Sequence, residues 1–381
     1  MAPVIWVRLL SAAVIGLVAW HGHFWALPLG LIAPCLIAAQ PSRIAAGCTA
    51  LVYYGSASLP VIAVSEVYWP SNSALAIGLW FAAAAMLSLP WVVFWTPRPA
   101  VRPWAVTAAL VLSAVPPLCI VGWASPLTST GVLFPGSAWF GIAAVVALPG
   151  LLIRRTTRIV GIFAATTASL ILNLESKPVN IPTGWEAEMT RIHRGNREDS
   201  LAEFRIEQRL QNAVTQSDAR FLVFPEAAVR HWTEATEAFW SPALDGTQKT
   251  VLLGAGQAIP SSSQYYNSVL IFGKEPRNAV HQRIPVPGGM WNPLQPEGTF
   301  AADLFAAGTV DVGGQRAAIL ICYEQLLAWP MLRSALEHPT LLIVISNEAW
   351  TSRTVVPRVQ QACARAWARL FGLPLISAIN S

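Results

Sequence analysis

One cysteine stands where an apolar run meets two polar residues. The stretch 317–330 reads AAILICYEQLLAWP and places Cys322 directly after a β-branched segment and directly before Tyr323 and Glu324. Such a run is typical of a buried strand, and a thiol at its carboxyl end is positioned to act as a nucleophile. Free cysteine is also among the most buried residue types, so an inert core thiol is the alternative interpretation. The neighbouring motifs decide between the two.

Polar residues close two other apolar runs. Glu226 ends the run RFLVFPE, and Asn347, with Trp350 three residues later, follows LLIVIS. Because α/β domains position their site residues in the loops at strand ends, these residues are candidates for one site with Cys322. A carboxylate close to a thiol can accept its proton and later return that proton to a leaving group. The pattern therefore favours nucleophilic catalysis.

The elements that must position these residues alternate between strand and helix. Strands are expected at 184–194, 220–229, 250–259, 266–273 and 338–352 and in the final LPLISAIN, and helices at 197–216 and 357–371. The segment VDVGGQRAAILICYE predicts a hairpin that leads into Cys322. This alternation predicts a layered α/β domain over residues 174–381.

The first 173 residues have a different composition. The whole chain of 381 residues has a mean hydropathy of +0.48, 17 Trp and only 12% charged residues, which indicates a membrane protein. Its first 173 residues contain no lysine, one acid (Glu66) and a set of scattered arginines: Arg8, Arg43, Arg98, Arg102, Arg154, Arg155 and Arg158. These arginines form no continuous basic face, so direct nucleic-acid binding is not expected.

Seven apolar windows predict about seven membrane crossings in a transmembrane helical domain over residues 1–173. They are 4–20, 24–39, 44–64, 74–95, 104–122, 131–153 and 159–172. All the arginines fall on one side of these windows, which the positive-inside rule assigns to the cytoplasm. The N-terminus is then cytoplasmic, and the α/β domain, after a linker at 175–183, lies in the periplasm of a bacterial inner membrane. The five cysteines show no metal-type spacing, so neither a metal nor a cofactor is expected.

The ordered motifs resemble those of the nitrilase, or carbon–nitrogen hydrolase, superfamily, and of its membrane branch, the apolipoprotein N-acyltransferases. The matching segments are Phe224-Pro225-Glu226, Ile321-Cys322-Tyr323-Glu324, Ser346-Asn347-Glu348-Ala349-Trp350 and the helix segment QQACAR at 360–365. The resemblance implies an αββα fold, Glu226 as general base, Cys322 as nucleophile and Glu324 as an assisting carboxylate. If the chain is an enzyme, Tyr323, Asn347 and Trp350 would shape a substrate pocket. The alternatives are that Glu324 is an ordinary acid at a helix N-terminus and that Asn347 and Trp350 form a structural turn.

The chain departs from this family at its catalytic lysine. The family lysine precedes a Val-Pro-Phe-Gly-Glu loop, and the matching stretch here is HQRIPVPGGMW at 281–291. Gln282 then occupies the lysine position, Arg283 is adjacent, and Met290 replaces the glutamate of the loop. A cation at this position would stabilise the oxyanion of a tetrahedral intermediate. Either Arg283 or Gln282 would have to take over that role.

This variant loop also resembles that of the conjugal-transfer TraB proteins of Ti-type plasmids. The resemblance implies a role in plasmid conjugation, with other conjugal-transfer proteins as partners and a membrane lipid or lipoprotein as substrate. Two functions remain open. The first is an acyltransferase or amidase that forms a thioester on Cys322, and the second is a catalytically impaired docking component of the conjugation apparatus.

Overall fold

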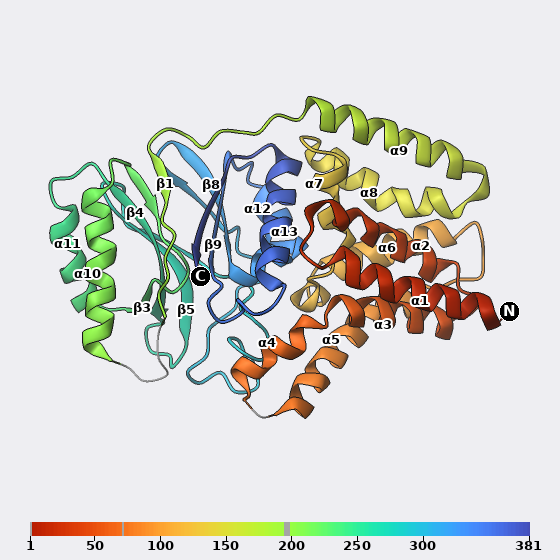
Figure 1. Ribbon diagram of the computed structural model, residues 1–381, viewed down its shortest axis with the longest axis horizontal. Coiled ribbons are helices and arrows are strands. Elements are labelled where there is room, and N and C mark those ends of the chain that lie inside the picture. The colour runs from red at the N-terminus through yellow and green to blue at the C-terminus, as the bar shows by residue number, and fades with distance from the viewer. Residues whose placement is uncertain (1, 71, 194–198) are drawn as a thin grey trace. The chain divides into compact units, whose positions relative to one another are not determined.

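The computed structural model describes residues 2–70, 72–193 and 199–381, which form two compact units (Figure 1). The first unit consists of Met1–Pro178, Leu326–Trp329 and Arg353–Gly372. The second consists of Val179–Gln325, Pro330–Ser352 and Leu373–Ser381. The helix in the segment 353–372 therefore belongs to the same unit as the N-terminal helices, although it lies near the C-terminal end of the sequence.

The first unit is helical. Its elements are α1 (Ala2–Ala19), η1 (Phe24–Leu31), α2 (Ile32–Ala38), α3 (Arg43–Ala57), α4 (Pro60–Tyr68), α5 (Ser73–Val93), α6 (Arg102–Ala114), η2 (Leu118–Val121), η3 (Pro126–Ser129), α7 (Thr130–Leu133), α8 (Ala138–Ile153), α9 (Arg155–Glu175) and α13 (Val356–Phe371). Side-chain caps begin α3, α5 and η3, because Ser42 accepts from Ala45 N, Asn72 from Leu75 N and Ser125 from Leu127 N.

Every apolar window contains helix, but few of these helices have the length of a bilayer. In the described residues, α5 and α9 are long and apolar enough to cross a membrane, and the bent pair α3 and α4 would make a third span. The window 4–20 corresponds to the continuous but shorter helix α1, whereas the helices in the windows 24–39, 44–64, 104–122 and 131–153 are interrupted. Pro60 begins α4 after a bend of 59°, and α6 stops at Ala114 before Pro116 and Pro117. Two helices of spanning length are therefore found, and seven crossings remain a prediction.

The second unit contains two sheets. Its elements are β1 (Trp185–Ala187), α10 (Ser200–Gln216), β2 (Phe221–Val223), β3 (Val229–Trp232), α11 (Glu234–Leu244), β4 (Thr250–Ala258), β5 (Tyr265–Gly273), β6 (Asn278–His281), β7 (Thr309–Val312), β8 (Gln315–Ile321), η4 (Cys322–Leu326), α12 (Ala328–Ala335), β9 (Leu341–Asn347) and β10 (Leu375–Asn380). In the described chain one sheet has the order β1-β2-β4-β5-β6, with β3 paired to β4, and the other has the order β10-β9-β8-β7.

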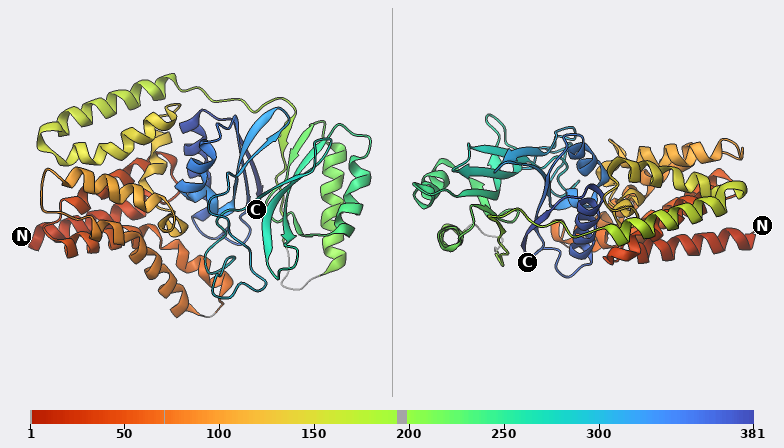
Figure 2. Two further views of the ribbon diagram at one scale, coloured as in Figure 1. Left: turned by 180° about the vertical axis from the view of Figure 1, so that it is seen from behind. Right: turned by 90° about the horizontal axis from the view of Figure 1, so that it is seen from above.

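The apolar faces of these sheets form two cores. Between the sheets, Val223 and Leu252 of one sheet belong to the same buried cluster as Ile319, Ile343 and Ile376 of the other, and Figure 2 shows the sheets face to face. A second cluster joins the outer face of the first sheet to α10 and α11. The second unit is therefore a layered α/β domain, as the strand and helix pattern predicted.

Several expected elements are shorter in the structure: the strands expected at 220–229 and 338–352 are β2 and β9, which span Phe221–Val223 and Leu341–Asn347. The strand expected at 184–194 is β1, which pairs with β2 over Trp185–Ala187, and beyond it Thr190 forms an isolated bridge with Asn380. The helix expected at 197–216 is α10, which begins at Ser200 after its cap Asp199; the first expected residues, like Arg194 of the strand, lie outside the described chain.

Candidate active site

Cys322 occupies a strained position at the carboxyl end of β8. Its φ of +49° lies in the left-handed region, which costs a residue with a side chain about 1–3 kcal/mol. A hydrogen bond stabilises this turn, because Ile321 N donates to Glu324 Oε2 at 2.9 Å. Cys322 is only 3% exposed. Backbone strain of this kind persists where the surroundings impose it, which distinguishes Cys322 from an ordinary core thiol.

The carboxylate of Glu226 meets this thiol. Glu226 follows β2, is 5% exposed, and has the Cys322 side chain among its hydrogen-bond partners. Its Oε1 accepts from Asn267 Nδ2 at 2.7 Å, and its Oε2 accepts from the backbone N of Asn347 at 2.9 Å. The structure thus brings together Glu226, Cys322 and Asn347, which the sequence placed at three separate strand ends.

Burial raises the pKa of Glu226 above its usual value. Desolvation is the largest cause, and the negative charge of Glu324 acts in the same direction. The hydrogen bonds from Cys322, Asn267 and the Asn347 backbone favour the charged form and oppose the rise. The resulting carboxyl group has a raised pKa and holds the thiol as a partner, which suits it to proton transfer.

A glycine lets the Glu226 turn approach β4. A Cβ on Gly254 would lie 2.1 Å from Pro225 O and 2.6 Å from Glu226 Cα, distances that real Cβ atoms do not adopt. Ala227, the residue after Glu226, has a φ of +52°. Both sides of the candidate pair therefore carry a left-handed residue that is not glycine, and the turn at Glu226 is held tightly against its neighbouring strand.

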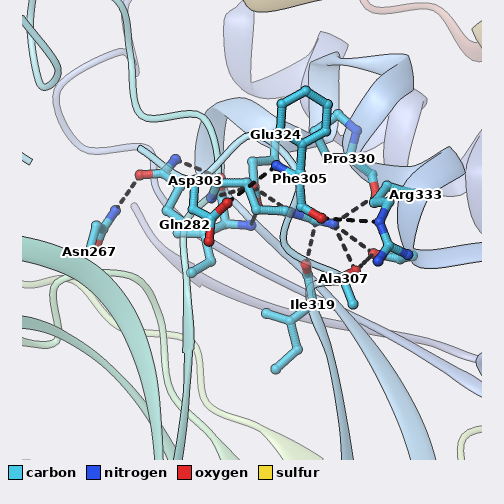
Figure 3. A network of polar contacts seen from close by, with 12 residues as sticks. Asn267, Gln282, Asp303, Phe305, Ala307, Ile319, Glu324, Pro330 and Arg333 are labelled. Carbon is cyan, nitrogen blue, oxygen red and sulfur yellow. Dashed lines mark hydrogen bonds and ion pairs between the residues drawn. The ribbon is translucent and has the colours of Figure 1, made fainter. Parts of the chain in front are cut away.

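Gln282 lies in the same polar cluster. Its Oε1 accepts from Asn267 Nδ2 at 2.8 Å and its Nε2 donates to Ile321 O at 2.9 Å, while the residue is only 1% exposed (Figure 3). One amide group, that of Asn267, thus bridges Gln282 and Glu226. In this cluster Gln282 offers a neutral amide donor.

Arg283 makes its contacts elsewhere. Its Nε donates to Glu324 Oε1 at 2.9 Å and its backbone N to the same oxygen at 2.7 Å. The rest of the guanidinium donates to backbone carbonyls and one hydroxyl, at Ile319, Ala307, Pro330 and Ser334, several of which appear in Figure 3. The Arg283 and Glu324 side chains are 0% and 1% exposed. They form a buried ion pair that stabilises the end of β8, directly before Cys322.

The remaining expected residues lie in the turns that follow β8 and β9. Tyr323 and Trp350 are half-buried there. Asn347 Oδ1 accepts from Asn380 Nδ2 at 2.9 Å, and Asn380 Oδ1 in turn accepts from Thr190 Oγ1 at 2.8 Å. This chain of amides fixes the turn whose backbone N–H reaches Glu226.

Sequence reasoning missed Asn267 and Asn380. Asn267 is 3% exposed within the apolar strand β5, and Asn380 is 2% exposed at the end of β10. A buried amide must find hydrogen-bond partners, so an asparagine inside an apolar strand run was the available signal. Its partners could not be identified from the sequence because they lie on other strands.

Comparison with known proteins now identifies the family. The carbon-nitrogen hydrolase family matches residues 200–380. The probable conjugal transfer protein TraB of Sinorhizobium fredii is 34% identical over 384 residues, which cover 98% of each chain. This chain belongs to the TraB family. The conjugal transfer protein TraB of Agrobacterium fabrum is 33% identical over 391 residues, covering 98% of this chain and 92% of that protein.

Part of this chain is also similar to acyltransferases. The apolipoprotein N-acyltransferase of Nitrosomonas europaea is 27% identical to this chain over 184 residues, which are 44% of this chain and 37% of that protein. The resemblance to the carbon–nitrogen hydrolases is thereby confirmed. In this TraB chain the similarity to the acyltransferases covers less than half of the residues.

Proposed function

We propose that this TraB-family chain is an integral protein of the bacterial inner membrane that serves plasmid conjugation and forms a thioester on Cys322. The observation that carries the proposal is the hydrogen-bonded pair of Glu226 and Cys322 at a strained strand end. A scaffold has no physical need for a left-handed cysteine against a buried carboxylate. Other conjugal-transfer proteins are the proposed partners.

The reaction follows from the roles of the two side chains. Glu226 takes the thiol proton, and the Cys322 sulfur attacks the carbonyl carbon of an acyl ester or amide from a membrane lipid or lipoprotein. When the tetrahedral intermediate collapses, the carbonyl carbon's bond to the leaving oxygen or nitrogen breaks, and Glu226 returns the proton to that leaving group. Water or an amine then receives the acyl group from the thioester.

The second amide hydrogen of Gln282 is the proposed oxyanion donor. Gln282 Nε2 has two hydrogens, and one acceptor, Ile321 O, is found among the described residues. Arg283 is committed to Glu324 and four neighbouring oxygens, so it serves the turn rather than the reacting carbonyl. A neutral donor stabilises an oxyanion less than an ammonium, so the chemistry is expected to be slow.

The Gln282→Lys variant is expected to raise the rate at which Cys322 is acylated by a p-nitrophenyl ester about tenfold, because it places a cation beside the developing oxyanion. Gln282→Met, of similar length but without a donor, should lower the rate by a similar factor. The measurement is the burst of p-nitrophenol from the full-length protein in detergent. Equal rates for all three proteins would contradict the assignment of Gln282.

The membrane location rests on composition and charge. The helices α5 and α9 have spanning length, and all seven arginines of the first 173 residues lie on one side of the predicted windows. The proposed orientation places the N-terminus in the cytoplasm and the carbon-nitrogen hydrolase domain in the periplasm. There the domain would meet acyl groups at the outer leaflet.

The neutral residue at position 282 also supports a second function. A domain that has lost its cation would be a docking component of the conjugation apparatus, in which Cys322 has no chemical role. The two functions differ in one result. Plasmid transfer that proceeds at the wild-type frequency with Cys322→Ala favours docking, and transfer that is lost with this variant favours the thioester.

A further inference from the structure

Two arginines of α13 share one face of that helix in the first unit. Arg365 and Arg369 are four residues apart, which places them one above the other. Their guanidinium carbons lie 4.5 and 5.3 Å from the centroid of the Phe24 ring, and that of Arg369 lies 5.6 Å from the Trp25 ring. Figure 1 shows α13 beside α7, with which it packs. Two like charges are thus held over the aromatic start of η1.

No carboxylate neutralises this pair among the described residues. The segments of the first unit contain twelve Arg and Lys residues and two acids, Glu66 and Glu175, and neither acid forms an ion pair with the two arginines. Burial, followed by the charge of Arg365, lowers the pKa of Arg369. The Arg369 Nη1 atom is buried and has no hydrogen-bond partner in the described chain. An unsatisfied cationic donor of this kind indicates a site for an anion.

A neighbouring amide holds one end of Arg369 in place. Asn173 Nδ2 donates to Val132 O at 3.1 Å, to Leu133 O at 3.2 Å and to Ser169 O at 2.9 Å. These contacts orient Asn173 Oδ1, which accepts from Arg369 Nη2 at 2.9 Å. The guanidinium is therefore fixed before any ligand arrives, while Nη1 remains unused.

The surroundings are those of a membrane interface. Trp25 is 67% exposed and Phe140 is 87% exposed, and Trp139 contacts Phe371 with ring centroids 5.9 Å apart. Asn173 lies in the last turn of α9, one of the two helices of spanning length. Exposed aromatic rings beside cations at the end of a span are typical of the headgroup region of a bilayer.

We propose that Arg365 and Arg369 bind the phosphate group of a glycerophospholipid. Two guanidinium groups present forked donors that match phosphate oxygens, and the exposed aromatic rings suit the adjoining glycerol and acyl carbons. The inference rests on the proposed membrane location but is independent of thioester chemistry at Cys322. Inorganic phosphate has the same recognition chemistry, so the experiment must separate the two sources.

The test is native mass spectrometry of the full-length protein in detergent during titration with phosphatidylglycerol. We expect the affinity to fall at least about tenfold in Arg365→Gln/Arg369→Gln, since each charged contact removed is worth roughly that factor. Arg365→Gln alone, which breaks no side-chain hydrogen bond found among the described residues, should show a smaller loss and controls for misfolding. Arg365→Lys/Arg369→Lys should retain part of the affinity. Arg353→Gln, an exposed arginine of the same unit, should bind as wild type does.

Three results of these binding measurements would contradict the proposed phosphate site. The first is a wild-type affinity for phosphatidylglycerol in the double glutamine variant. The second is equally tight binding of diacylglycerol, which lacks the phosphate. The third is displacement of the lipid by an equal concentration of inorganic phosphate, which would show a site for free phosphate. Cys322→Ala should bind the lipid normally, so failure of this site and failure of the thioester proposal can be told apart.

Discussion

Glu226→Gln is expected to slow the alkylation of Cys322 by a factor of about 10² to 10⁴, the usual contribution of a general base. The substitution keeps the size of the side chain but removes the proton acceptor from the thiol. Because the pKa of Glu226 is raised, the fraction of Glu226 that is ionised increases with pH over an interval that lies above the usual glutamate pKa of about 4.3. The wild-type rate should rise with pH in that interval, and this rise should be missing from the variant.

The measurement is iodoacetamide labelling of the Cys322 peptide, followed by mass spectrometry, because the chain has four other cysteines. Glu188→Gln is a matched control, since burial, followed by the charge of Glu186, also raises the pKa of this carboxyl. The Glu188 variant should keep the wild-type rate and pH profile. A Glu226→Gln protein that is alkylated as fast as wild type, with the same pH dependence, would show that Glu226 does not act on the thiol.

Arg283→Met is expected to lower the free energy of unfolding by about 3–5 kcal/mol, because it leaves the Glu324 carboxylate buried without a counter-ion. The guanidinium also donates to Ile319 O, Pro330 O and Ser334 Oγ, and these acceptors would lose their donor. For a domain of this size the loss corresponds to a melting temperature roughly 10 °C lower. Thermal unfolding of the full-length protein in detergent measures it.

An exposed ion pair with the same distance between the arginine Nε and a carboxylate oxygen serves as a control. Arg316 Nε lies 2.9 Å from Asp311 Oδ1, the distance found between Arg283 Nε and Glu324 Oε1, but the side chains of Arg316 and Asp311 are 47% and 71% exposed. Arg316→Met should leave the free energy of unfolding nearly unchanged, because exposed pairs contribute little. Similar melting temperatures for the two methionine variants would contradict a bracing role for Arg283.

The strand ends that bear Glu226, Cys322 and Asn347 could be predicted because each follows a short apolar run, and the parallel strands β8 and β9 bring Cys322 and Asn347 to one edge of their sheet. That Glu226 reaches them from β2 of the other sheet could not be predicted, because it depends on how the two sheets pack. The sequence could not decide whether Gln282 or Arg283 lies in the polar cluster with Glu226. Neighbouring residues of an extended segment point to opposite sides, so a shift of one residue exchanges their roles. The structure assigns Gln282 to the cluster of Asn267 and Glu226, and Arg283 to Glu324.

The helical half shows a different limit of prediction. Hydropathy located the helical segments, since each apolar window contains helix, but it did not locate their interruptions. The bend between α3 and α4 and the end of α6 coincide with prolines, whose effect on a helix depends on the packing around them. The association of α13 with these helices was also beyond reach, because it depends on contacts between residues about 200 positions apart, such as Arg369 and Asn173.

The central claim is that Cys322 carries an acyl group. Its most direct test is intact-mass analysis of the protein purified from its native membrane, beside Cys322→Ala and Glu226→Gln. We expect a fraction of the wild-type protein to carry a lipid-sized adduct that hydroxylamine removes, and both variants to lack it. A wild-type protein with no adduct, an unreactive Cys322 and undiminished plasmid transfer by Cys322→Ala would contradict the claim.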